Sequence, residues 1–219
     1  MHIPDGIVPI GVAVAGYAVT GAATWYSLRK INQADDPREY VPKAALLTAA
    51  FFVASWIHIP IPPTSVHLIL NGLMGVMLGF FAFPAILIGL IFQAVLFGHG
   101  GITTLGVNAA MIGIPALLAH GIFQMRHLAS FGSEEVRSGI FGFVGGATAM
   151  GLSVLIFFAL MVMTMPADIN AEIERAAISA LSIAHLPVML IEGALTARLV
   201  TFLLRVKPTL LGGMSEARA

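Results

Sequence analysis

Long apolar runs without charge dominate the chain. Residues 7–28 form a run of 22 residues with no Asp, Glu, Lys or Arg, and residues 66–97 form another of 32 residues. One helical crossing of a bilayer takes about 20 apolar residues. Backbone polar groups must be satisfied internally in lipid, and a helix achieves this within one segment. The runs therefore predict an all-α integral membrane protein.

The composition excludes several other classes of protein. Of 219 residues, 58% are apolar and 10% are charged, against about a quarter charged in soluble domains. Lys and Arg together equal Asp and Glu, at 11 each, so the basic surplus of a nucleic-acid binder is missing. The absence of Cys excludes disulfides and thiolate metal sites. We expect a single transmembrane domain over residues 1–219.

The apolar runs predict about seven transmembrane helices in one bundle. The run at residues 66–97 is too long for one comfortable crossing, so we interpret it as two short helices that turn near Phe83–Pro84. The prolines after Ile59 close the second run. The predicted spans are residues 7–28, 44–59, 66–97 as two helices, 103–123, 139–163 and 176–204.

The distribution of basic residues predicts the orientation of the bundle. If the N-terminus is outside, ten of the eleven Lys and Arg residues face the cytoplasm, and Arg175 alone lies outside. This agrees with the positive-inside rule and favours an odd number of spans, with residues 206–219 as a cytoplasmic tail. Residues 1–6 carry no Lys or Arg before the first run, unlike a signal peptide, so we expect the mature chain to begin at Met1.

Four histidines gather at the predicted outer face. They are His2, His58, His67 and His99. Hydrogen-bonded loop residues would account for each one singly, whereas four on one face are also typical of a metal site. The two interpretations remain open at this point.

A histidine at position 2 has a special chelating geometry. The α-amine of Met1, the amide nitrogen of His2 and the His2 ring can bind one metal ion, closing a five-membered and a six-membered ring. Ni(II) and Cu(II) prefer square-planar nitrogen sites of this kind. His67, at the outer start of the third predicted span, is the best candidate for the fourth nitrogen. The alternative is that Met-His is simply how the chain begins.

Further polar residues accompany these histidines. Residues 3–6, Ile-Pro-Asp-Gly, form a turn signal that can fold the N-terminal segment back into the bundle. Asp5 either orients the His2 ring or caps the first helix. Asn71 and Asn108 either surround the site or join helices by hydrogen bonds. The candidates for residues around the ion are Asp5, Thr64, Ser65, Asn71, His99 and Asn108.

Three motifs resemble one known family. Met-His-Ile-Pro-Asp-Gly at residues 1–6, Pro-Thr-Ser-Val-His at 63–67 and the stretch from Gln93 to Asn108 are similar to the nickel/cobalt (CbiM/NikM) substrate-binding components of prokaryotic energy-coupling-factor (ECF) transporters. The resemblance covers roughly residues 1–205. It implies Ni(II) or Co(II) as the transported substrate, with Met1, His2 and His67 as ligands, and favours a nickel-type member. The chain has His99 where the family has an acidic residue, so that position inherits no role.

The resemblance also implies partners in the plasma membrane: a transmembrane coupling protein, two cytoplasmic ATPase subunits and often a small accessory membrane protein. The chain itself has no Gly-x-x-x-x-Gly-Lys-Ser/Thr motif and is therefore predicted not to be an enzyme. We expect contact with membrane lipid and no nucleic acid or organic cofactor. The alternative function is a stand-alone transition-metal permease or channel, which would place polar residues along the whole bundle rather than near its outer end.

Overall fold

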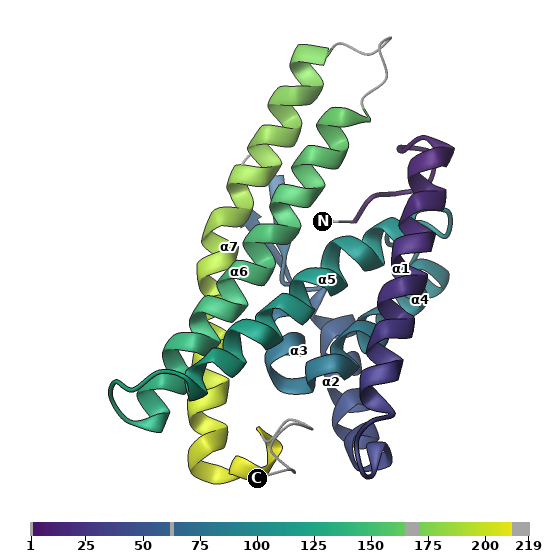
Figure 1. Ribbon diagram of the computed structural model, residues 1–219. Helices are drawn as coiled ribbons and strands as arrows, with labels where there is room; N and C mark the ends of the chain where they lie inside the picture. Colours follow the sequence, from purple (N-terminus) through teal and green to yellow (C-terminus); the bar gives the residue numbers. More distant parts are fainter. Residues whose placement is uncertain (1, 62–63, 165–170, 212–219) are drawn as a thin grey trace.

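The computed structural model describes residues 2–61, 64–164 and 171–211, and these residues are mostly helical (Figure 1). The α-helices are α1 (Ile10–Ile31), α2 (Val41–Ala54), α3 (Asn71–Leu78), α4 (Ala82–Phe97), α5 (Leu105–Gln124), α6 (Glu134–Met163) and α7 (Ala171–Val206). Two strands, β1 (His58–Ile61) and β2 (Thr64–His67), lie between α2 and α3. Short 3₁₀ turns are η1 (Pro37–Tyr40), η2 (Gly79–Phe81), η3 (Met125–His127) and η4 (Pro208–Leu210).

Within these residues, four helical segments are long and apolar enough to cross a membrane. They are Asn71–Phe97, Leu105–His127, Glu134–Met163 and Glu172–Val206. The prediction of a helical membrane protein is confirmed, whereas the count by length and hydropathy is four rather than seven.

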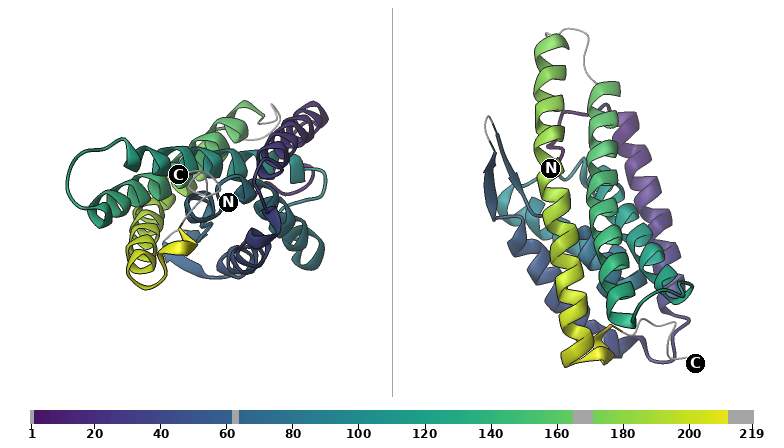
Figure 2. Two further views of the ribbon diagram at one scale, coloured as in Figure 1. Left: turned by 60° about the horizontal axis from the view of Figure 1, so that its bottom comes forward. Right: turned by 90° about the vertical axis from the view of Figure 1, so that its left-hand side faces the viewer.

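The second predicted span is the clearest correction to the sequence analysis. The helix expected over residues 44–59 ends at Ala54, and an antiparallel hairpin follows in which His58 pairs with His67. The all-α prediction is therefore wrong here. Alternating Ile and Pro suit a short strand, because proline is tolerated where a strand has a free edge. The hairpin lies beside α7 (Figure 2).

The long run at residues 66–97 does contain two helices, but they do not meet where predicted. The break falls at Gly79–Phe81, where Gly79 has a φ of +58° that favours glycine. Pro84 lies in the first turn of α4, where the missing N–H costs no hydrogen bond. The proline that suggested the turn is thus compatible with the helix itself.

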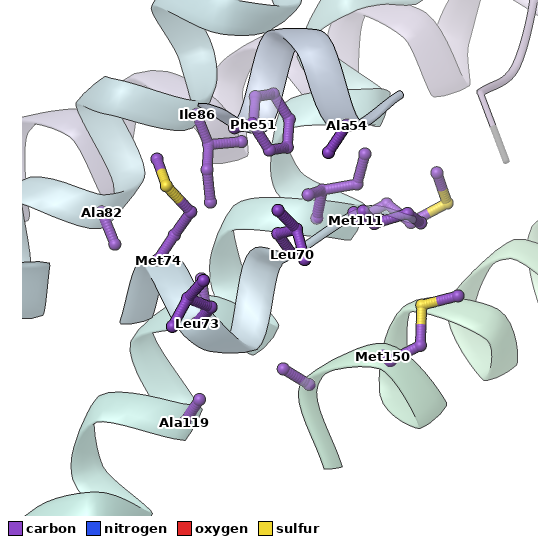
Figure 3. Packing of buried hydrophobic residues seen from close by; sticks show 14 of the residues in the cluster. Phe51, Ala54, Leu70, Leu73, Met74, Ala82, Ile86, Met111, Ala119 and Met150 are labelled. Atoms are coloured by element: carbon purple, nitrogen blue, oxygen red, sulfur yellow. The ribbon is translucent and has the colours of Figure 1, made fainter. Parts of the chain in front are cut away.

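The short helix α3 forms the centre of the molecule. All eight of its residues are buried, and it packs against α4, α5 and α6. Met74 of α3, Ile86 of α4 and Phe51 of α2 gather in this core (Figure 3). A helix that is apolar on every side belongs in such surroundings. The turn that leads from β2 into α3 is consequently held close to the core.

Several ends that carry basic residues lie at one end of the molecule. The C-terminal ends of α1 and α7 and the connection from α5 to α6 lie together at the bottom of Figure 1. They carry Arg29, Arg126 and Arg205. The described N-terminal residues lie away from that end.

Candidate metal centre

The N-terminal segment is fixed inside the protein. Ile3 is fully buried, and its N–H donates to Oδ1 of Asn108 while Nδ2 of Asn108 donates to the Ile3 carbonyl, both at 2.9 Å. The Thr104 hydroxyl donates to the same carbonyl at 2.6 Å. Asn108, in the first turn of α5, therefore pairs with Ile3 as a neighbouring strand would. This pairing gives residue 2 a defined place.

Asp5 fastens the segment to the loop before α5. Its carboxylate accepts hydrogen bonds from the N–H and hydroxyl of Thr103, at 2.8 and 2.5 Å, and from the N–H of Ile102 at 3.2 Å. The Thr103 hydroxyl lowers the pKa of Asp5. The N-cap of α1 is Pro9, so the predicted capping role is wrong. These bonds also run to the loop rather than to the His2 ring.

The glycine-rich loop at residues 98–101 packs directly on this segment. A Cβ at Gly101 would lie 2.0 Å from Oδ1 and 2.6 Å from the backbone nitrogen of Asp5, so only glycine fits there. The backbone of this loop therefore lies directly against the N-terminal segment.

Three histidines from distant parts of the chain meet beside this segment. One ligand atom from each of His2, His67 and His99 lies within 4.8 Å of the others. Their ring centroids are 5.3 Å apart for His2–His67 and His67–His99, and 4.4 Å apart for His2–His99. His58, opposite His67 in the hairpin, is exposed, with its ring 5.9 Å away. The structure therefore gathers three of the four predicted histidines closely and leaves the fourth at the edge.

His67 is held in one tautomer. Its Nδ1 lies 3.1 Å from the Leu68 carbonyl oxygen, which can only accept, so Nδ1 carries the proton and Nε2 the lone pair. Burial lowers the pKa of His67 to about 3, and the residue is 4% exposed. Metal-binding imidazoles commonly donate their other N–H to a carbonyl in this way.

His2 and His99 face each other. His2 Nδ1 lies 2.9 Å from His99 Nε2, and burial lowers the pKa of both rings. Among the described atoms, His2 Nε2 and Gln93 Oε1 are both buried without a hydrogen-bond partner, and Gln93 opposes the lowering of the His2 pKa. A neutral His2 ring with its proton on Nε2 has its lone pair on Nδ1. The site thus presents neutral imidazoles, the form that binds metals.

The other predicted residues are less directly involved. Met1 lies outside the described residues, and for Thr64 and Ser65 the structure describes only their pairing within the hairpin. Asn71 donates to the Ile112 carbonyl and to Ser153 Oγ, at 3.1 and 2.9 Å. It therefore joins α3 to α5 and α6, which is the interhelical alternative.

Two residues have more to do with the site than the sequence analysis assigned to them. Gln93 of α4, to which the sequence analysis gave no role, donates to Ser55 Oγ at 3.1 Å and also adjoins His2. Glu192 of α7 accepts hydrogen bonds from the N–H groups of Ile69 and Leu70, just after His67. The available signal was their polarity inside predicted spans, since intramembrane polar residues are costly and tend to be functional.

Comparisons with known proteins agree on one family. Residues 2–210 match the family described as CbiM, cobalt uptake substrate-specific transmembrane region. A putative metal transport protein of Haemophilus influenzae is 33% identical over 213 residues, which are 95% of each chain. A putative cobalt transport protein, CbiM 1, of Methanocorpusculum labreanum is 31% identical and is matched over 92% of its length.

A fused nickel transport protein, NikMN, of Rhodobacter capsulatus is 33% identical over 230 residues, covering 96% of this chain and 64% of the relative. A solved structure of a truncated transition metal transporter superposes with a TM-score of 0.74 at 26% identity, covering 94% of this chain and 99% of the other. The similar proteins are metal transport components rather than enzymes. This chain belongs to the CbiM family and is a multi-pass membrane component of prokaryotic cobalt and nickel transport.

Proposed function

We propose that the chain captures Ni(II), or alternatively Co(II), at the outer face of the membrane through nitrogen ligands from Met1, His2 and His67. The observation that carries this proposal is the convergence of three neutral histidine rings, with ligand atoms within 4.8 Å of one another, beside an N-terminal segment that buried hydrogen bonds hold in place. A disordered N-terminus would need none of these bonds.

The chemistry of the chelate favours nickel. The α-amine of Met1 and the amide and Nδ1 of His2 occupy three corners of a square, and the fourth corner adjoins Nδ1. We assign that corner to His67, as the family resemblance implies: its ring centroid lies 5.3 Å from that of His2, and its Nε2 carries the lone pair because Nδ1 donates to the Leu68 carbonyl. His99, whose Nε2 lies 2.9 Å from His2 Nδ1, is placed beside the bound ion.

Delivery into the cell is the second part of the proposal. We propose one membrane domain over residues 1–219 in which seven helices form a single bundle, with the short α3 buried inside it. A metal-binding segment at residues 1–6 lies outside, and residues 206–219 form a cytoplasmic tail. Support comes from the basic ends of α1 and α7, which lie at one end of the molecule, away from the described N-terminal residues (Figure 1). That arrangement agrees with the positive-inside rule.

The energy source is proposed to lie in partner subunits. The chain has no phosphate-binding Gly-x-x-x-x-Gly-Lys-Ser/Thr motif, so uphill import needs ATP hydrolysis elsewhere. We propose a transmembrane coupling protein, two cytoplasmic ATPases and a small accessory membrane protein, as in energy-coupling-factor importers, with no organic cofactor in this chain.

The test is a one-residue extension before Met1. It converts the α-amine into an amide and should abolish tight Ni(II) binding, while the same residue added after Ala219 leaves binding intact. His67→Ala should weaken binding strongly, and His99→Ala less. Titration of the purified protein by absorbance measures all four forms. Unchanged Ni(II) affinity in the N-terminally extended protein would refute the chelate, and Ni(II) uptake into liposomes by this chain alone would favour the permease.

A further inference from the structure

A carboxylate inside the protein is bound by a backbone turn rather than by solvent. Glu192, in the membrane-spanning helix α7, is 1% exposed. Its Oε1 accepts the N–H of Ile69 at 2.5 Å, and its Oε2 accepts the N–H of Leu70 at 3.0 Å. Both oxygens thus serve the three-residue connection between β2 and α3. Burying a carboxylate is costly unless it is hydrogen-bonded, and these two bonds offset that cost for Glu192.

The Ile69 N–H belongs to the same peptide unit as the Leu68 carbonyl. That carbonyl accepts the Nδ1 proton of His67 at 3.1 Å. A peptide unit is planar and rigid, so a group that fixes the N–H on one side also fixes the direction of the carbonyl on the other. Glu192 therefore acts on the imidazole of His67 through a single peptide plane.

The second bond, from the Leu70 N–H, stabilises an unfavourable backbone conformation in the turn. Leu70 has a φ of +57°, a region that non-glycine residues with a Cβ disfavour. Surrounding structure must hold such a residue in place, and the Leu70 N–H is bound by Glu192. The first residue of α3, Asn71, follows at once. The carboxylate thus stabilises the change of direction between the hairpin and the buried helix.

We propose that Glu192 is a positioning residue for the metal site: it sets the tautomer and direction of the His67 imidazole, and so makes metal affinity depend on how α7 is seated against the β2–α3 turn. The proposal rests on the proposed function in that His67 is a metal ligand. Outer partners that orient a metal-binding histidine have this role in other metal sites. Displacement of α7 relative to the turn loosens the hold on His67 and lowers affinity.

The test replaces Glu192 by Gln, which keeps the size of the side chain but offers only one acceptor oxygen to two N–H groups. Loss of such an outer partner is expected to weaken Ni(II) binding by about 10- to 100-fold. Thr196→Val is the matched control. Thr196 is also buried on α7, one turn further along, and its hydroxyl donates to the Glu192 backbone carbonyl rather than to the turn. This control should bind Ni(II) as the wild type does.

Two further measurements separate positioning from general stability. Glu192→Asp keeps a carboxylate but withdraws it from the turn, and should show the same loss in case the Gln variant does not fold. Nitrogen NMR of histidine-labelled, metal-free protein should show His67 in the Nδ1–H form in the wild type and in Thr196→Val, and a mixture of tautomers in the Glu192 variants.

The proposal is overturned if Glu192→Asp or Glu192→Gln binds Ni(II) as tightly as the wild type, or if Thr196→Val loses as much affinity. An unchanged His67 tautomer in the Glu192 variants also overturns it. If the wild type itself binds neither Ni(II) nor Co(II), the proposed function fails, and this result is distinct from a wild type that binds metal with no dependence on Glu192.

Discussion

Replacing Asn108 by Ala should separate the N-terminal segment from its place in the site. The Ile3 carbonyl keeps its bond from Thr104, so the change leaves one buried donor, the Ile3 N–H, without its acceptor. An unsatisfied buried donor costs about 1–3 kcal/mol, equivalent to about 5- to 150-fold in an equilibrium constant. Because residue 2 is a ligand in the proposed site, we expect Ni(II) affinity to fall within that range.

The assay is a Ni(II) titration of purified protein against a competing chelator, with thermal unfolding of the metal-free protein measured in parallel. Thr20→Val is the control, since it removes a 2.6 Å hydrogen bond from α1 to the Gly106 carbonyl without a contact to Ile3. It should lower stability and leave affinity unchanged. If Asn108→Ala keeps the wild-type affinity, or both variants lose affinity equally, the pairing of Asn108 with Ile3 does not seat the metal-binding segment.

Two other perturbations act on the same region. Gly101→Ala brings a Cβ within 2.0 Å of the Asp5 carboxylate, so it should displace the N-terminal segment and weaken Ni(II) binding. Gly121→Ala is the control, because the space around its Cβ is open, and it should bind Ni(II) as the wild type does. Equal titration curves for the two variants would contradict this. The metal-free protein should lose stability as the pH falls from about 6.5 toward 3. The pKa of His67 is lowered to about 3 in the folded protein, so over this range the unfolded chain binds a proton at this residue and the folded chain does not. One such group changes the free energy of unfolding by up to about 1.4 kcal/mol per pH unit. Thermal unfolding of His67→Asn should show a shallower dependence on pH, and an identical slope would exclude His67 as the cause.

Hydropathy predicted the long helices well and the short elements poorly. The run at residues 103–123 corresponds closely to α5, and the run at 176–204 lies within α7. The stretch from residue 55 to 67 was misread because apolar residues without clear periodicity fit a helix or a strand equally well. The break between α3 and α4 was predicted at Phe83–Pro84, but it falls at Gly79–Phe81. Proline costs no hydrogen bond in the first turn of a helix, so Pro84 does not end one.

For the site, covalent chemistry was informative and long-range contacts were not. The chelating potential of His2 follows from two consecutive residues, and the structure brings His67 and His99 to it. The partners that hold these histidines have no such local signal. Asn108 binds the backbone of Ile3, 105 residues away, and Glu192 binds that of Ile69, 123 residues away. A side chain that bonds to a backbone N–H needs no particular residue type at that position, so the sequence contains no pattern that marks the pair. Only the fold identifies such a contact.

The distribution of these buried polar side chains bears on how the site works. Asn108 of α5, Gln93 of α4 and Glu192 of α7 each meet a different piece of the site: the N-terminal segment, the His2 ring and the turn after His67. Non-helical backbone at membrane depth is tolerated where it is buried in protein, and each of these side chains adjoins such backbone or the His2 ring. A continuous permeation route would instead leave polar groups directed along the bundle. Since three separate helices hold the three pieces together, a relative movement of any one of them weakens the site as a whole, and this agrees with the proposed capture of the metal outside and its proposed release when partner subunits move the helices.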